Sequence, residues 1–266
     1  MLMAVDVGNT QTVLGVFEGG ELRAQWRITT EANRTADELG AVYTTLMGQR
    51  GLACGDVDAV IASSVVPTLT RAYQNLARNV FHAPFKAVGP GLETGLKNRY
   101  EDPSSVGADR IVNAVATGKL YGFPAVIVDI GTATTVEAVD AESNYLGGAI
   151  FTGLNVALEA LISRTAKLPS VNLEGATPPA IATNTPDSIR SGFIYGYAGA
   201  LDALVRRFKA ELNCPEDDIH VVATGGPATV IVRHCREIQT FDADLTLNGL
   251  RILHEMNADS STLKLP

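Results

Sequence analysis

Apolar residues gather in short runs along the chain, and polar turn residues separate the runs. Runs of this kind predict buried strands, whereas apolar residues spaced three to four apart predict helices with one buried face. Strands are expected over residues 2–5, 12–17, 22–28, 57–62, 85–88, 125–128, 135–139, 220–223 and 237–241. Helices are expected over residues 36–47, 67–80, 111–121, 154–163, 186–212 and 247–256.

Strands alternate with helices, and each half of the chain opens on a pair of strands joined by a tight turn. This order predicts an α/β fold whose sheets are mixed rather than purely parallel. We divide the chain into an N-terminal half at 1–118 and a C-terminal half at 119–257. A tail at 258–266 is expected to be weakly ordered.

The turns that open the two halves carry nearly the same residues. The first reads Asp6-Val7-Gly8-Asn9-Thr10 and the second reads Asp129-Ile130-Gly131-Thr132-Ala133-Thr134. Such a turn offers backbone N–H groups and hydroxyls to phosphate oxygens, and its aspartate can hold a hydrated Mg²⁺. A single copy is typical of ordinary turns. Two copies favour a nucleotide held in a cleft between two related domains, with donors from Gly8, Asn9, Thr10, Thr12, Gly131, Thr132 and Thr134, and with Mg²⁺ on Asp6.

Gly107-Ala108-Asp109-Arg110 stands at an expected helix start. One interpretation is structural, since an aspartate near a helix N-terminus stabilises the helix by about 0.5–2 kcal/mol. The other is chemical: Asp109 would take a proton from a substrate hydroxyl, and Arg110 would hold a substrate carboxylate. The segment alone leaves both open.

Two glycine patterns also allow two interpretations. Thr224-Gly225-Gly226 after a strand is either a turn into a helix or an opening for a flat base or ribose. Gly192, Gly196 and Gly199 share one face of the expected long helix, which indicates close approach of another backbone. That backbone belongs either to a core helix or to a partner subunit.

Composition narrows the function classes. The chain has 266 residues, a net charge of −8 and no basic run, which argues against a nucleic-acid surface. It has no apolar segment long enough to span a membrane. Its three cysteines fit a reducing, cytoplasmic compartment, and no metal-binding spacing joins them to the four histidines. The first residues lead directly into the first turn, so no targeting segment is expected.

The motifs described above occur in the order found in type III pantothenate kinases, and the chain resembles that family over about residues 1–257. The resemblance also rests on segments 63–67, 147–153, 165–169, 184–185, 191–192 and 244–250. It implies a fold of duplicated actin-like (ribonuclease H-like) ATPase domains, with mixed sheets flanked by helices. This is the superfamily of acetate kinase, sugar kinases, Hsp70 and actin.

The resemblance implies that ATP phosphorylates pantothenate to 4′-phosphopantothenate, the first step of coenzyme A synthesis. It implies that Asp109 is the catalytic base and that Asp129 binds a monovalent cation, potassium or ammonium. The implied pantothenate site comprises Tyr100, Gly107, Ala108, Asp109, Arg110 and Thr185. The implied ATP site comprises Asp6, Val7, Gly8, Asn9, Thr10, Gln11, Thr12, Val13, Gly131, Thr132, Thr134, Gly225 and Gly226. It further implies a homodimer.

One position departs from the family pattern. The family has a proline where this chain has Thr152, and threonine frees φ and restores an N–H donor. Two rival hypotheses stay open, and this threonine favours only the second of them. One is another kinase or phosphatase of the same superfamily, which a panel of acceptors would reveal. The other is a regulator that binds nucleotide without transferring a phosphoryl group.

Overall fold

The computed structural model describes residues 1–258, which form two compact units. Unit 1 comprises residues 1–96, 101–119 and 244–258, and unit 2 comprises residues 97–100 and 120–243. The sequence-based division differs in two places: residues 97–100 belong to unit 2, and the last helix packs in unit 1. The tail expected at the C-terminus lies, from residue 259 onward, outside the described residues.

Unit 1 is built on a five-stranded sheet in the order β3-β2-β1-β4-β5. Its strands are β1 Leu2–Val7, β2 Gln11–Glu18, β3 Glu21–Thr29, β4 Ala59–Ser64 and β5 Phe85–Ala87. The first three are antiparallel neighbours, whereas β4 runs parallel to both β1 and β5. The helices of unit 1 are α1 Ala36–Gly48, α2 Pro67–Leu76, α3 Ala108–Leu120 and α7 Leu245–Met256. A single π turn at Ala77–Phe81 extends α2.

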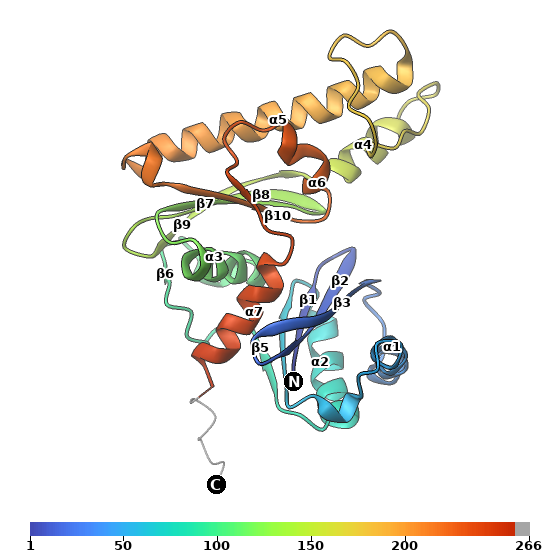
Figure 1. Ribbon diagram of the computed structural model, residues 1–266, viewed down its shortest axis with the longest axis vertical. Helices are drawn as coiled ribbons and strands as arrows, with labels where there is room; N and C mark the ends of the chain where they lie inside the picture. The colour runs from blue at the N-terminus through green and yellow to red at the C-terminus, as the bar shows by residue number, and fades with distance from the viewer. Residues whose placement is uncertain (259–266) are drawn as a thin grey trace. The chain divides into compact units, whose positions relative to one another are not determined.

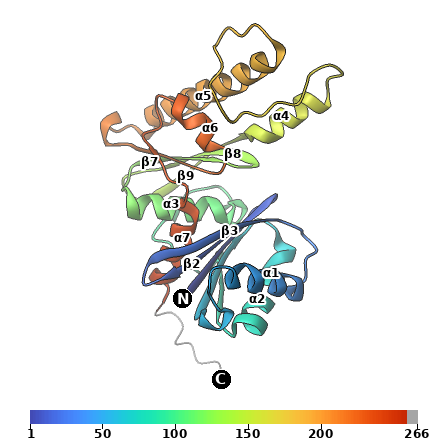
Figure 2. The same cartoon turned by 45° about the vertical axis from the view of Figure 1, so that its right-hand side comes forward.

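Helices cover both faces of the first sheet, because its strands are apolar on both sides. Met3 and Val5 pack with residues of α1 and α2, while Ala4 packs with residues of α3 and α7. Figures 1 and 2 show α1 and α2 together on one side of this sheet. Gly249 lets α7 approach α3 closely, since a Cβ there would lie 2.7 Å from a methyl carbon of Val112.

Unit 2 repeats this plan with one strand more. Its sheet has the order β11-β10-β7-β8-β9-β6. The strands are β6 Lys97–Asn98, β7 Ala125–Ile130, β8 Ala133–Val139, β9 Asn144–Thr152, β10 His220–Thr224 and β11 Thr240–Phe241. The helices are α4 Leu154–Ser163, α5 Thr185–Leu212 and α6 Ala228–Ile231. Apolar residues of α4, α5 and α6 pack on Val126, Val128 and Val136, and Figure 1 shows α5 lying along that face.

Local chemistry explains where the main helices begin. Thr35 and Glu38 form a reciprocal capping box at α1. The Asn184 side chain accepts the backbone N–H of Asp187 at the start of α5. The strand expected at 237–241 shrinks to β11, because the N–H groups of Arg236 and Glu237 donate to the buried Asp202 carboxylate instead of to a strand.

Candidate active site

The two aspartate turns occupy the same place in the two sheets. Asp6 lies beside Ser63 in the parallel pair of β1 and β4, and Asp129 lies beside Thr224 in the parallel pair of β7 and β10. Each aspartate is therefore the next-to-last residue of the strand that enters its turn. The internal repeat read in the sequence is a repeat in the sheets as well.

The carboxyl group of Asp6 is held in an environment that disfavours its charge. Burial raises the pKa of Asp6 from 3.8 to about 6. The hydroxyl of Ser63 donates to Asp6 Oδ1 at 2.5 Å, which lowers this pKa, and the negative charge of Asp109 raises it. Because the charge of Asp109 acts on Asp6, the carboxylates at the end of β1 and at the start of α3 interact electrostatically. A cation near Asp6, or a proton on its carboxylate, is therefore favoured.

The first turn, residues 8–11, exposes its middle. The Gly8 N–H donates to the Gln11 carbonyl at 3.1 Å, and a Cβ on Gly8 would lie 2.9 Å from that oxygen. Asn9, Thr10 and Gln11 are exposed. Thr12, by contrast, is 1% exposed, and its hydroxyl bonds that of Thr30 at 2.9 Å.

The second turn, residues 131–133, is one residue shorter. The Gly131 N–H donates to the Ala133 carbonyl at 3.0 Å, and Thr132 is exposed. Thr134 is fully buried, and its hydroxyl has no hydrogen-bond partner among the described residues. Both side chains lie on the buried face of their strands, which Thr12 shares with Leu14 and Thr134 shares with Val136. That their hydroxyls contact ATP stays a prediction.

A residue that the sequence analysis did not assign holds the second turn in place. The Gly153 N–H donates to the Thr132 carbonyl at 3.1 Å, and a Cβ on Gly153 would overlap the carbonyl oxygens of Gly131 and Thr132. The Tyr197 hydroxyl donates to the carbonyls of Thr152 and Gly153 at 3.2 and 3.4 Å. The resemblance in segment 147–153 was the available signal for this support.

Asp129 lies against a glycine that cannot be replaced without movement. Gly225 has φ +99°, and a Cβ there would lie 2.8 Å from Asp129 Oδ1 and overlap the Ile130 carbonyl oxygen. Gly226 follows and is exposed. Gly225 therefore lets this turn pack closely against the end of β7.

Asp109 and Arg110 begin α3. Asp109 Oδ1 accepts the Arg110 backbone N–H at 2.9 Å, and a Cβ on Gly107 would lie 2.5 Å from the same oxygen. A side chain at residue 107 would therefore displace the Asp109 carboxylate from this position, and Arg110 is largely buried. Val7 is fully buried, and its hydrocarbon side chain packs in the core of unit 1.

The remaining expected site residues lie in unit 2. Tyr100 follows β6, and its backbone N–H donates to Asn98 Oδ1 at 3.0 Å. Thr185 is the first residue of α5 and lines an apolar groove of about 690 Å³. The groove is also lined by Phe151, Thr152, Ala157, Leu161, Leu168, Ser188, Ile189, Gly192, Phe193, Gly196, Tyr197 and Ala200.

The glycine stripe of α5 has no neighbour in unit 2. A Cβ added to Gly192, Gly196 or Gly199 would meet nothing within 4 Å among the described residues. The interpretation that these glycines receive a core helix of the same chain is therefore wrong for residues 1–258.

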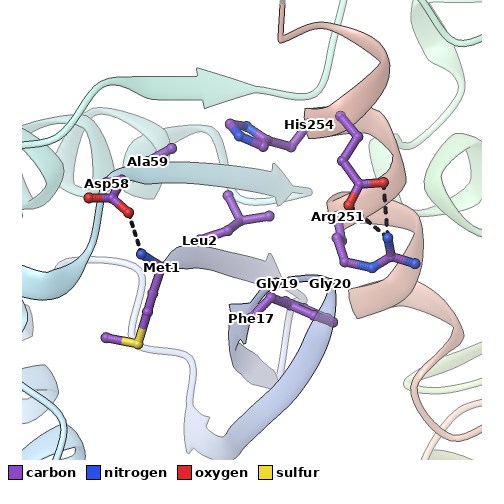
Figure 3. Close-up of a pocket in the computed structure, with 10 residues that line it drawn as sticks. Met1, Leu2, Phe17, Gly19, Gly20, Asp58, Ala59, Arg251 and His254 are labelled. Carbon is purple, nitrogen blue, oxygen red and sulfur yellow. Dashed lines mark hydrogen bonds and ion pairs between the residues drawn. The ribbon is translucent and has the colours of Figure 1, made fainter.

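A second hollow, of about 250 Å³, belongs to unit 1 but lies away from these motifs (Figure 3). It is lined by Leu2 and Ala59, at the starts of β1 and β4, whereas Asp6 and Ser63 stand near the ends of the same strands. Arg251 and His254 of α7 face it, and Arg251 pairs with Glu255. It is no part of the candidate site.

The ligands that the candidate site provides for a cation are oxygen atoms. No cluster of three or more His, Cys, Asp or Glu residues suited to a metal occurs in residues 1–258. A single carboxylate with a raised pKa, such as Asp6, fits a hard divalent ion that takes its other ligands from phosphate and water. Searched over the same residues, no helix is long and apolar enough to cross a membrane.

These features define an actin-like fold of the kind found in sugar kinases. One similar structure, described as a 2-dehydro-3-deoxygalactonokinase from Sinorhizobium meliloti, has a TM-score of 0.55 at 12% identity and covers 100% of this chain and 98% of that one. Another, described as a Baf family transcriptional activator from Campylobacter jejuni, has a TM-score of 0.62 at 16% identity and covers 97% and 99%. At these identities the likeness shows the fold alone.

The chain belongs to the type III pantothenate kinase family, whose model matches residues 2–207. A type III pantothenate kinase from Rubrobacter xylanophilus is 62% identical over 260 residues, which is 97% of this chain and 98% of that protein. A second, from Pelobacter propionicus, is 47% identical over 258 residues, covering 97% and 100%. The resemblance read from the motifs is confirmed.

Proposed function

We propose that this protein transfers the terminal phosphoryl group of ATP to the primary hydroxyl of pantothenate, giving 4′-phosphopantothenate for coenzyme A synthesis. The observation that carries the proposal is the near full-length similarity to type III pantothenate kinases. The site residues support it, since the chain keeps both aspartate turns and the Gly107–Arg110 segment.

In unit 1, Asp109 is the proposed catalytic base, which orients the acceptor hydroxyl and takes its proton as the phosphoryl group transfers. Arg110 is proposed to bind the pantothenate carboxylate, supported by the fixed fork of its guanidinium donors. Gly107 and Ala108 are proposed to leave room for the acceptor. In unit 2, Tyr100 and Thr185 are proposed to contact pantothenate.

The proposed ATP-binding groups are the exposed parts of the two turns. In unit 1 these are the backbone of Gly8 and the side chains of Asn9, Thr10 and Gln11. In unit 2 they are Gly131, Thr132 and the Gly225–Gly226 backbone. Preorganised donors aimed at phosphate oxygens stabilise the charge of the transferring group without reorganisation.

Two cations are part of the proposal. Asp6 would hold Mg²⁺ through water, and the ion would neutralise phosphate charge when bound. The raised pKa of Asp6 supports this, because a buried carboxylate with a second carboxylate acting on it gains from a nearby cation. Asp129 would hold potassium or ammonium, for which carboxylate and carbonyl oxygens are suitable ligands.

A homodimer is the proposed assembly, with the glycine-bearing face of α5 as its contact. Two observations support this: Gly192, Gly196 and Gly199 face open space, and the apolar groove includes two of them. A bulky charged residue at that face, Gly196→Arg, should convert the dimer to a monomer in analytical ultracentrifugation. Gly55→Arg, at another glycine with open surroundings, is the matched control. A wild-type monomer would contradict the assembly.

The deciding experiment couples ADP release to a spectroscopic readout, with and without pantothenate, in the presence of Mg²⁺ and K⁺. ADP release that requires pantothenate is expected, and sodium in place of potassium should slow it. A panel of sugars replaces pantothenate as the control for another kinase of the same fold. Binding of ATP without transfer to any acceptor would contradict the proposal. Its setting is proposed to be the cytoplasm, which the three free cysteines of the described chain accord with.

A further inference from the structure

A buried carboxylate and a buried phenol pair in the second sheet, outside the groups used above. Glu137 of β8 is 1% exposed and Tyr145 of β9 is 0% exposed. The Tyr145 hydroxyl donates to Glu137 Oε2. Burying an ionisable group costs free energy unless the group is well hydrogen-bonded, so the burial of Glu137 in this sheet needs an explanation.

The sequence makes room for that carboxylate by placing Gly148 opposite it. Gly148 pairs with Glu137 in the antiparallel ladder of β8 and β9. A Cβ on Gly148 would lie 2.7 Å from Glu137 Oε2 and would overlap the Val136 carbonyl oxygen. The carboxylate therefore occupies the space that a side chain at Gly148 would fill.

The neighbouring glycine makes the same kind of room for Tyr100. Gly147 has φ +113°, and a Cβ there would lie 3.0 and 3.1 Å from two ring carbons of Tyr100. The pairing of β8 and β9 shifts register between Ala138 and Val139, which leaves Leu146 as the extra residue of a β-bulge beside Gly147. The rings of Tyr100 and Tyr145 lie 6.4 Å apart at 46°. One side chain thus contacts Glu137 at its hydroxyl and Tyr100 at its ring.

The backbone of Tyr145 holds the same segment. Asn98 of β6 pairs with Tyr145, and the Arg99 N–H donates to the Tyr145 carbonyl at 2.9 Å. Figure 1 shows β6 beside β9, at the edge of the sheet. This pairing is what assigns residues 97–100 to unit 2, so the place of Tyr100 depends on β9.

We propose that Glu137 and Tyr145 are positioning residues that set the Tyr100 ring and thereby the affinity for the acceptor. The inference rests on the proposed function, in which Tyr100 contacts pantothenate. Removing the hydroxyl of Tyr145 frees its ring to tilt, and the ring of Tyr100 then loses its fixed neighbour. The affinity for pantothenate is therefore lowered, while the affinity for ATP does not change.

A double-mutant cycle on the full-length protein tests this. Tyr145→Phe should raise KM for pantothenate about five- to tenfold while KM for ATP stays within about twofold. In a Tyr100→Ala background the same substitution should change KM for pantothenate by less than about twofold, because the ring through which it acts is gone. Glu137→Gln keeps an acceptor for the hydroxyl and should retain most of the affinity, whereas Glu137→Ala should match Tyr145→Phe.

Tyr121→Phe is the matched control, since the Tyr121 hydroxyl donates to Asp242 Oδ2 at 2.9 Å elsewhere in unit 2. It should change neither KM. Equal effects of Tyr145→Phe with and without Tyr100, or a rise in KM for ATP of the same size, would overturn the inference alone. A wild-type protein that releases no ADP with pantothenate would overturn the proposed function and this inference with it.

Discussion

The two aspartate turns have the same position in their sheets but hold their carboxylates by different means. In unit 1, a serine of the neighbouring strand donates a hydrogen bond to Asp6, and a second carboxylate, Asp109, acts on it through space. In unit 2, the residue after the neighbouring strand is Gly225, whose missing side chain leaves room for Asp129. Asp6 is held by a side chain of the neighbouring strand, whereas beside Asp129 the neighbouring strand leads into a glycine.

This difference shows that two turns at the same place in two similar sheets can be held by different neighbours. A buried carboxylate with a second carboxylate acting on it ionises less readily than one in water, so Asp6 gains from a nearby cation. Beside Asp129, the Gly225 backbone comes so close to the Ile130 carbonyl that a side chain at residue 225 has no room. The two turns are therefore expected to respond differently to substitution.

The largest effect is expected at Asp109, which adds the second carboxylate to unit 1. Asp109→Asn should lower kcat by about 10²–10⁴-fold, because a general base of this kind contributes that much to proton transfer. ATP affinity, measured by calorimetry, should change little. Asp37→Asn is the matched control, since Asp37 is also the second residue of its helix and is exposed. Near wild-type turnover by Asp109→Asn would remove the base assignment.

Gly225 tests the other side of the comparison. Gly225→Ala should lower the free energy of unfolding by about 3 kcal/mol, because φ is +99° and the new Cβ overlaps the Ile130 carbonyl oxygen. Gly91 has φ +92° with nothing within 4 Å, so Gly91→Ala should cost only about 1 kcal/mol. Urea denaturation of both variants separates overlap from backbone strain. Equal costs would mean that the space beside Asp129 is not needed.

The repeat itself was predictable from sequence, because it lies in local patterns: apolar runs, a turn with aspartate and glycine, and another apolar run. The burial of Thr12 follows from the same pattern, since Thr12, Leu14 and Val16 share one face of β2, although its place beside the first turn favours an exposed donor. The bond between Ser63 and Asp6 was not, because it depends on the register of two parallel strands far apart in the chain.

The strand β6 was also beyond sequence reasoning. Lys97–Asn98 is two polar residues long and has no periodicity, and it becomes a strand only by pairing with β9. The last helix packs in unit 1 for the same reason, since its apolar face matches the sheet formed by the start of the chain. Pairings between distant segments decide these assignments, and local patterns do not contain them.

The raised pKa of Asp6 predicts how stability depends on pH. Between the unfolded value of 3.8 and the folded value of about 6, the native state binds more protons than the unfolded state, so stability falls as pH rises through this window. Asp6→Asn should remove the fall, and by pH 7.5 it should be about 3 kcal/mol more stable than wild type in Mg²⁺-free buffer. Urea denaturation at pH 4 and pH 7.5 measures this. Asp37→Asn should follow the wild-type curve, and an Asp6→Asn protein less stable at pH 7.5 would contradict the burial of charge.

The smallest effect is expected at Ser63, whose hydroxyl donates a hydrogen bond to Asp6. Ser63→Ala removes the hydrogen bond that lowers the pKa of Asp6, so this pKa should rise above about 6. The acid limb of kcat/KM for ATP should then move to higher pH by about half to one unit, while the rate at pH 8.5 stays close to wild type. Ser64→Ala is the matched control, because the Ser64 hydroxyl bonds the backbone of Val66 at 3.0 Å instead. An acid limb that shifts equally in both variants would mean that the serine acts on the turn and not on the charge of Asp6.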